Sequence, residues 1–116
     1  INELIEKKRG KKINFYEIDL NDSKVYKLIS SGDTFGIFQL KSSFMQDILT
    51  RVKPTKFEDL SAILALSFPK PIENGTLNDF IDKKQNKVKI NYFFDEFEQP
   101  LKPILGLTYG VIVYQE

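Results

Sequence analysis

The side chains of this sequence that could contact a phosphate or a base lie in several short stretches. Phe68 and Lys70 stand in the proline-containing stretch at residues 67–71, and Lys83 and Lys84 are adjacent near the end of a predicted helix. Lysine ammonium groups bind phosphates, and an aromatic ring can stack on a base. In the alternative interpretation, Phe68 fills the core and the lysines are solvated. The sequence leaves both interpretations open.

Glutamine and tyrosine side chains at the ends of two predicted strands form a second set of candidates. Gln39 follows Phe38, and Gln115 follows Tyr114. The two amides could hydrogen-bond a nucleotide, although neighbouring backbone groups are the more common partners of such side chains. Tyr114 could stack on a base, but tyrosines in this setting more often pack against other side chains.

This sequence lacks the common catalytic and metal-binding motifs. It has no cysteine and no histidine, which excludes disulfides, zinc sites and His- or Cys-based catalysis. It contains no glycine-rich phosphate loop and no Asp-x-Asp pair for two divalent metal ions. Asp95, Glu96 and Glu98 form an acidic cluster that could bind a metal, but a solvated loop is the simpler interpretation. We therefore predict no catalytic residue and no metal ligand in this chain.

The composition indicates one modest domain. The 116 residues are 41% hydrophobic and include ten Phe and five Tyr, which predicts a core with aromatic packing. A net charge of +1 does not by itself argue for nucleic acid, so an anionic partner would need a local basic cluster. No apolar run is long enough for a membrane span, and no signal peptide is visible. We expect a piece of a longer cytoplasmic protein with no membrane partner.

The longest apolar run, at residues 60–66, predicts a buried helix around which the other elements are organised. Thr55 with Glu58 matches a capping box, in which each side chain binds the backbone N–H of the other residue. Pro69 should end the helix, because proline pushes the residue before it out of the helical region. Pro71 prevents immediate re-entry, so we predict a stiff, extended loop there.

Hydrophobic periodicity and turn residues predict a mainly α fold with a small two- or three-stranded β element. Further helices are expected at residues 1–8, 22–30, 43–53 and 76–84. Two strands are expected at residues 35–40 and 109–114, with a short edge strand at residues 88–92.

Several motifs occur in an order and at spacings that resemble one protein family. In chain order they are G-D-T-F-G-I-F-Q-L at residues 32–40, F-E-D at 57–59, P-K-P at 69–71, D-F-I at 79–81 and T-Y-G-V-I-V-Y-Q-E at 108–116. The series resembles the alpha subunit of bacterial DNA polymerase III, a C-family replicative polymerase, over residues 19–116. The first and last motifs are the most specific.

The resemblance implies a helical fingers-type subdomain and a role in DNA replication. Residues 1–31 would be connector helices that follow a palm domain outside this chain, and residues 32–116 would be the N-terminal part of the fingers domain. The full-length protein would be a DNA-directed DNA polymerase that binds primer–template DNA and incoming dNTP, and other replisome subunits would bind regions outside this chain. The palm aspartates would hold Mg²⁺, so this fragment alone would be inactive.

The chain departs from the family pattern where the family loop reads aromatic-Arg-Pro-Gly-Pro. Phe68 occupies the arginine position and Lys70 the glycine position, while Lys41 replaces the acidic residue of the family's F-Q-L-E-S. Lys70 could supply the missing positive charge. Alternatively, the protein is a divergent, non-catalytic module that binds DNA or replisome proteins, or a helical interaction domain unrelated to replication. The candidates for contact with nucleotide or DNA are Gln39, Lys41, Phe68, Lys70, Lys83, Lys84, Tyr114 and Gln115.

Overall fold

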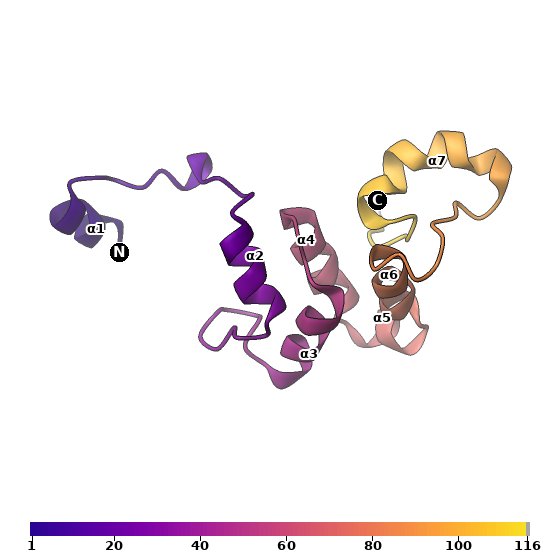
Figure 1. Ribbon diagram of the computed structural model, residues 1–116, viewed down its shortest axis with the longest axis horizontal. Coiled ribbons are helices and arrows are strands. Elements are labelled where there is room, and N and C mark those ends of the chain that lie inside the picture. Colours follow the sequence, from indigo (N-terminus) through magenta and orange to yellow (C-terminus); the bar gives the residue numbers. More distant parts are fainter. Residues whose placement is uncertain (116) are drawn as a thin grey trace.

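The computed structural model describes residues 1–115, which fold into α-helices and short 3-10 helices (Figure 1). The α-helices are α1 (Asn2–Arg9), α2 (Ser23–Ser30), α3 (Ser43–Val52), α4 (Phe57–Leu66), α5 (Pro69–Glu73), α6 (Thr76–Lys84) and α7 (Glu98–Leu105). The 3-10 helices are η1 (Phe15–Glu17), η2 (Asp95–Phe97) and η3 (Gly106–Thr108). The prediction of a mainly α fold is confirmed.

The hydrophobic core lies where α3, α4 and α6 meet, with α2 packed against α3. Helix α4 stands between α2 and α6 in Figure 1, whereas α1 lies apart from the core at the end of an extended connector. Ala62, Ile63 and Leu66 of α4 are buried, which confirms the predicted central, buried helix. The other buried members of the core are Ile29, Leu40, Met45, Ile48, Leu49, Val52, Leu77, Phe80, Ile81 and Val111.

The start of α4 differs from the predicted capping box. The N-cap position is held by Lys56, whose side chain makes no capping hydrogen bond. The Thr55 backbone N–H and hydroxyl donate instead to Oδ2 of Asp59, at 2.9 and 3.2 Å. Because the helix begins at Phe57, Asp59 rather than Glu58 occupies the position from which a carboxylate reaches back over the first turn. The predicted partnership of Thr55 with Glu58 is therefore wrong.

The prolines that follow α4 begin a helix instead of forming an extended loop. Ser67 ends α4, and Phe68 adopts the extended conformation expected of a residue before proline. Pro69 then occupies the first position of α5. In the first turn of a helix, the missing N–H of proline costs nothing, because that N–H would have no partner within the helix. The predicted stiff loop at residues 67–71 is wrong for this reason.

The prediction of a small β element is also wrong, because none of residues 1–115 forms a strand. In residues 35–40, Gly36 and Gln39 have φ angles of +89° and +63°, and the Leu40 N–H donates to the Ile37 carbonyl oxygen. Left-handed residues separated by so few positions reverse the chain, and the local turns use backbone groups that a sheet would require.

The second predicted strand, at residues 109–114, begins with two residues in the left-handed region. Tyr109 and Gly110 have φ angles of +57° and +76°, and the Val111 N–H donates to the Thr108 carbonyl oxygen. The segment then continues without a ladder partner among the described residues, and residues 88–92 form no strand either. The alternation of Val, Ile and Tyr side chains thus reflects burial of Val111 and not a sheet.

Candidate functional site

A buried carboxylate connects three distant parts of the chain. The Asp59 side chain is fully buried, and its Oδ2 lies 2.8 Å from Nζ of Lys84 in α6. Its Oδ1 accepts a 2.9 Å hydrogen bond from the hydroxyl of Tyr109, which follows η3. Thr55, in the link before α4, supplies the two further donors described above. We call these four residues the Asp59 cluster.

The other members of the Asp59 cluster also contact one another. Lys84 Nζ lies 3.2 Å from both the Thr55 hydroxyl and the Tyr109 hydroxyl, and 5.3 Å from the centre of the Tyr109 ring. That ring packs edge to face on Phe80, with the ring centres 5.3 Å apart. Lys56 Nζ lies 5.1 Å from the same ring centre, so two ammonium groups contact one tyrosine.

The electrostatics of the Asp59 cluster hold each acid in one protonation state near neutral pH. Burial acts to raise the pKa of the Asp59 carboxyl, but the hydrogen bonds from Lys84, Thr55 and Tyr109 outweigh it and lower the pKa below its ordinary value. Burial, followed by the hydrogen bond to the Asp59 carboxylate, raises the pKa of Tyr109 far above its ordinary value. Both carboxylate oxygens already accept from protein donors, and the Tyr109 hydroxyl donates to one of them, so the cluster is suited to holding structure and not to acid–base catalysis.

The chain that follows Tyr109 carries two predicted contact residues back to α4. Val111 is buried in the core, and the Tyr114 hydroxyl donates to Oγ of Ser61 in α4 at 3.1 Å. Tyr114 and Gln115 are both exposed. Residues 109–114 are therefore held against α4 at both ends, by a buried contact at Asp59 and an exposed one at Ser61.

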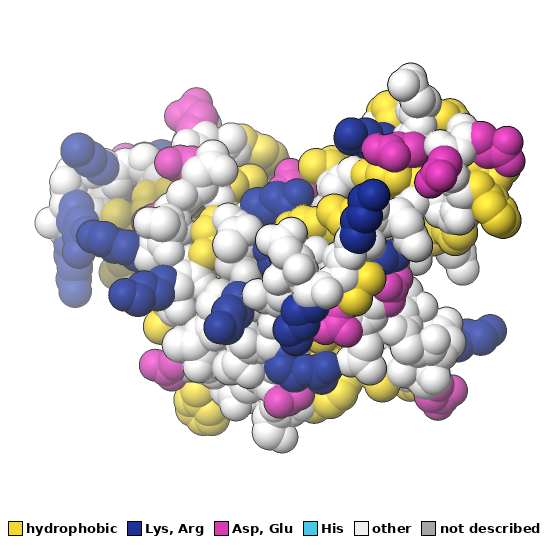
Figure 2. Space-filling model, turned by 45° about the vertical axis from the view of Figure 1, so that its right-hand side comes forward, with side chains coloured by type: hydrophobic (Ala, Val, Ile, Leu, Met, Phe, Trp, Pro, Cys, Tyr) yellow, Lys and Arg dark blue, Asp and Glu magenta, His cyan; other side chains and the backbone are white. Residues whose placement is uncertain are grey.

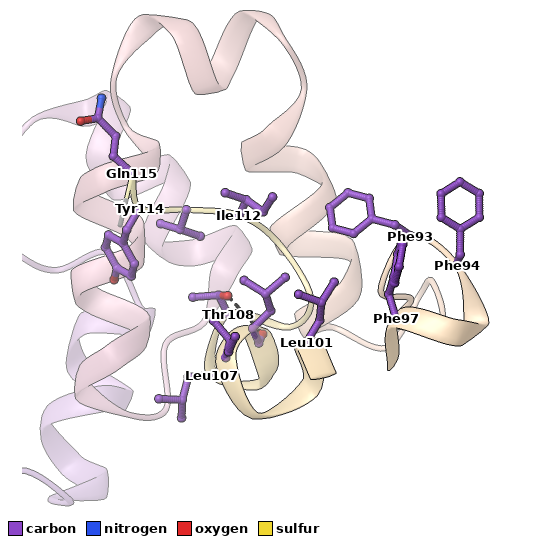
Figure 3. A pocket seen from close by; sticks show the side chains of 12 residues that line it. Phe93, Phe94, Phe97, Leu101, Leu107, Thr108, Ile112, Tyr114 and Gln115 are labelled. Atoms are coloured by element: carbon purple, nitrogen blue, oxygen red, sulfur yellow. Dashed lines mark hydrogen bonds between the residues drawn. The ribbon is translucent and has the colours of Figure 1, made fainter. Parts of the chain in front are cut away.

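Tyr114 and Gln115 also border an apolar groove of about 620 Å³ between α7 and the C-terminal segment (Figure 3). Phe93, Phe94 and Phe97 lie at the opposite side of the groove from Tyr114 in Figure 3. The rings of Phe94 and Phe97 pack edge to face with centres 5.7 Å apart. The remaining lining residues are Leu101, Ile104, Leu105, Leu107, Thr108, Ile112 and Val113.

The adjacent lysines of α6 have their charges engaged inside the fold. Lys83 is buried, and its Nζ lies 2.9 Å from Oδ2 of Asp79 on the same helix. The side chain of Lys84 is only 6% exposed in its pair with Asp59. The interpretation of Lys83 and Lys84 as solvated lysines at a helix end is therefore wrong. Neither ammonium group is free to meet a phosphate without losing a carboxylate partner.

The candidates at the start of α5 are exposed. Phe68 retains 65% of its accessible surface, so the interpretation that Phe68 fills the core is wrong. Lys70 is also exposed on the first turn of α5. Both side chains are accessible to a ligand approaching this helix.

The remaining candidates, Gln39 and Lys41, are exposed in the turns that precede α3. This loop lies on the opposite side of α3 and α4 from α5 and α7 in Figure 1. The predicted contact residues therefore do not form one cluster. Figure 2 shows Lys and Arg side chains scattered over the middle of the face that it presents, with a further group at its left edge.

Sequence reasoning missed Asp59 as the centre of the site. One signal was available, because Asp59 precedes Ala62, Ile63 and Leu66 by three, four and seven positions and so lies on the apolar face of the helix. A carboxylate on a buried face needs a cationic or hydrogen-bonding partner. The spacing of Lys84 and Tyr109 in the sequence does not identify them as those partners.

The part of the chain that the structure describes has neither a metal-binding cluster nor a membrane-spanning helix. Residues 1–115 contain no group of three or more His, Cys, Asp or Glu side chains that could hold a metal ion. Both oxygens of the buried Asp59 already accept hydrogen bonds from protein donors, so this carboxylate does not fit a metal site. No helix among these residues has the length and apolar character needed to cross a membrane.

Comparison with known proteins places this chain in a family. The family model described as the bacterial DNA polymerase III alpha subunit finger domain matches residues 1–116. The DNA polymerase III subunit alpha of Campylobacter jejuni is 54% identical over 113 residues, which is 97% of this chain and 9% of that protein. The subunit alpha of Aquifex aeolicus is 46% identical over 116 residues, or 100% of this chain and 10% of that protein. The chain thus spans about a tenth of the length of these relatives.

Proposed function

The chain belongs to the family of bacterial DNA polymerase III alpha subunit finger domains, and on that basis we propose that it is the part of a replicative DNA polymerase that helps to position primer–template DNA and the incoming dNTP. The observation that carries this proposal is the 54% identity to an alpha subunit across 97% of the chain. The match of the family model to residues 1–116 supports the same proposal.

We assign the nucleotidyl-transfer chemistry to residues outside this chain. The Asp59 carboxylate is committed to protein donors, and residues 1–115 offer no group of acids for a metal. The Mg²⁺ ions that polymerases use to activate the primer hydroxyl and neutralise the triphosphate would be held elsewhere in the full-length protein. The finger domain would supply positioning and positive charge, and the whole protein would act in the cytoplasm with other replisome subunits bound elsewhere on it.

Residues 1–31 would connect this domain to the polymerase palm, and residues 32–116 would begin the fingers. The separate position of α1 in Figure 1 supports a connecting role for the start of the chain. Helix α2 packs on α3, so the connection would continue directly into the core of the fingers.

Six exposed side chains are the proposed contacts with nucleotide or DNA. Lys70 would replace the charge that the family carries at the position of Phe68, because the two residues are separated by only Pro69 at the start of α5. Lys83 and Lys84 are not among the six, because each ammonium group is already paired with a carboxylate inside the fold. The six are Gln39, Lys41, Phe68, Lys70, Tyr114 and Gln115.

A primer-extension assay on the full-length protein with Mg²⁺ tests this function. We expect extension of a primed template, and we expect Lys70→Ala to raise the KM for dNTP. Lys24→Ala, which removes an exposed lysine of α2 outside the proposed contacts, is the matched control. An unchanged KM in Lys70→Ala would remove Lys70 from the phosphate contacts.

The replacement of the family's arginine by Phe68 favours one other candidate function, a non-catalytic module that binds DNA or replisome proteins. This candidate predicts that the full-length protein retards primed DNA in a gel but does not extend the primer. Extension at a rate typical of polymerases, about 1 s⁻¹ or faster, would exclude it.

A further inference from the structure

We propose that the Asp59 cluster is a positioning device that holds residues 109–115 against α4 and so places Tyr114 and Gln115 for contact with nucleotide or DNA. This inference rests on the proposed function, because it assigns a purpose to the position of these two side chains. In this role, Tyr109 and Lys84 fix the position of the backbone of residues 109–115 and do not touch substrate.

The contacts of Tyr109 support this role. Its hydroxyl donates to Asp59 across 50 residues of sequence, and its ring packs on Phe80. Tyr109 itself has a φ of +57°, so the chain changes direction directly after the side chain is anchored. The orientation of residues 110–115 is therefore determined at the residue that the cluster holds.

The ionic character of the cluster argues for positioning more than for stability. A buried ion pair often contributes no more stability than well-packed apolar residues of similar size, because both charges must lose their hydration. Hydrogen bonds, however, constrain direction and distance, which apolar packing does less strictly. Asp59 receives donors from the link before α4, from α6 and from the chain after η3. These donors fix three backbones relative to one another.

The second contact of the segment lies on the surface and cannot replace the first. Tyr114 is 44% exposed, and its hydroxyl meets Ser61 where water competes for both groups. Without the Tyr109 hydroxyl, residues 110–115 would be held by the packing of Val111 and Val113 on the core, by the 2.7 Å hydrogen bond from the Thr108 hydroxyl to the Val111 carbonyl oxygen, and by this exposed hydrogen bond. None of these contacts replaces the link from Tyr109 to the Asp59 carboxylate. We therefore expect the segment to become more mobile while the helical core remains folded.

Tyr109→Phe in the full-length protein is the central test, because it keeps the ring on Phe80 and removes only the hydroxyl. We expect faster backbone hydrogen exchange at Gly110 and Val111, whose N–H groups donate to the carbonyl oxygens of Leu105 and Thr108, and unchanged exchange in α3. With dTTP on a poly(dA)–oligo(dT) primer–template, we expect KM for dTTP to rise at least about threefold with kcat within about twofold. Lys87→Met, which removes an exposed lysine paired with Asp82, is the control that should change neither readout.

The conservative variant Lys84→Arg separates positioning from loss of charge. Lys84→Arg retains a cation opposite Asp59. Its KM for dTTP should therefore be closer to that of the original protein than the KM of Lys84→Met is. If Tyr109→Phe leaves the exchange of Gly110 and Val111 unchanged, or raises it without raising KM, the positioning role is overturned. A fall in kcat at constant KM would also overturn it. If the original protein extends no primer, the proposed function fails instead, and the exchange measurement still decides whether the cluster holds the segment.

Discussion

Lys84 and Asp59 form a 2.8 Å ion pair in which the lysine side chain is 6% exposed and the carboxylate is fully buried. The pair joins α6 to the start of α4, two helices that also share the core. It differs from the exposed pair of Lys87 with Asp82, in which both partners remain in contact with water. Several measurable properties of the protein depend on this difference.

Removing one partner of the buried pair should be costly. Lys84→Met leaves the Asp59 carboxylate buried without its cation, and we expect the free energy of unfolding to fall by about 3–5 kcal/mol. The double variant Asp59→Asn with Lys84→Met removes both charges and should recover part of this loss. Urea denaturation followed by circular dichroism measures both. The control Lys87→Met should change stability by less than about 0.5 kcal/mol, and an equal loss in the two single variants would contradict the burial of the Asp59 pair.

The stability of the protein should respond to pH through the same cluster. The pKa of Asp59 is lowered in the folded state, so its contribution to stability is present above the unfolded-state value near 3.8 and is lost as the pH falls through the folded-state pKa. Asp59→Asn should remove this acid-dependent loss. Melting temperatures measured from pH 2 to pH 6 test the prediction. The same decrease in melting temperature at low pH in both proteins would exclude Asp59 as its source.

Tyr109 should make the stability of the protein depend on pH in the alkaline range. Its pKa is raised in the folded state, chiefly by burial and then by the Asp59 carboxylate, so its contribution is present below the unfolded-state value near 10 and is lost as the pH rises above it. Tyr109→Phe should therefore be less sensitive to alkali than the original protein between about pH 10 and pH 12. Titration of tyrosine absorbance at 295 nm should also show one fewer late-titrating phenol in the variant.

The turn after Tyr109 should not tolerate a side chain. Gly110 has a φ of +76°, and a Cβ there would lie 2.7 Å from the backbone oxygen of Asn91. We expect Gly110→Ala to cost more than the roughly 1–2 kcal/mol of left-handed strain alone, because backbone must also move. Gly36→Ala is the matched control, since Gly36 has a φ of +89° but no atom near its added Cβ. If both variants lose the same stability, close packing at Gly110 is not the cause.

The exposed Phe68 should be dispensable for folding. Phe68→Ala should change the free energy of unfolding by no more than about 0.5 kcal/mol, because the ring is 65% exposed at the start of α5. Phe80→Ala, in contrast, removes a fully buried ring and should cost about 3–5 kcal/mol. A loss in primer extension with Phe68→Ala but without a loss of stability would identify a contact role for this ring. A large loss of stability would show that Phe68 packs against part of the fold.

The sequence by itself determined the helices whose limits are marked by local chemistry. The helix at residues 76–84 is confirmed as α6, and the apolar run at residues 60–66 lies within the buried helix α4. Such limits are local, because turn residues and hydrophobic periodicity act within a few residues of one another. The ordered motifs also identified the family, which the comparisons confirm.

Only the tertiary structure decided which residues meet. Asp59 pairs with Lys84 and Tyr109 because the packing of α4 on α6 and the left-handed turn at Tyr109 bring them together, and neither event is encoded in the spacing of these three residues. The same limitation explains the mistaken strand that begins at Tyr109, where the local pattern permits two backbone conformations and contacts with distant residues select one of them. The missed helix at Pro69 has a local cause instead, because proline is accepted in the first turn of a helix.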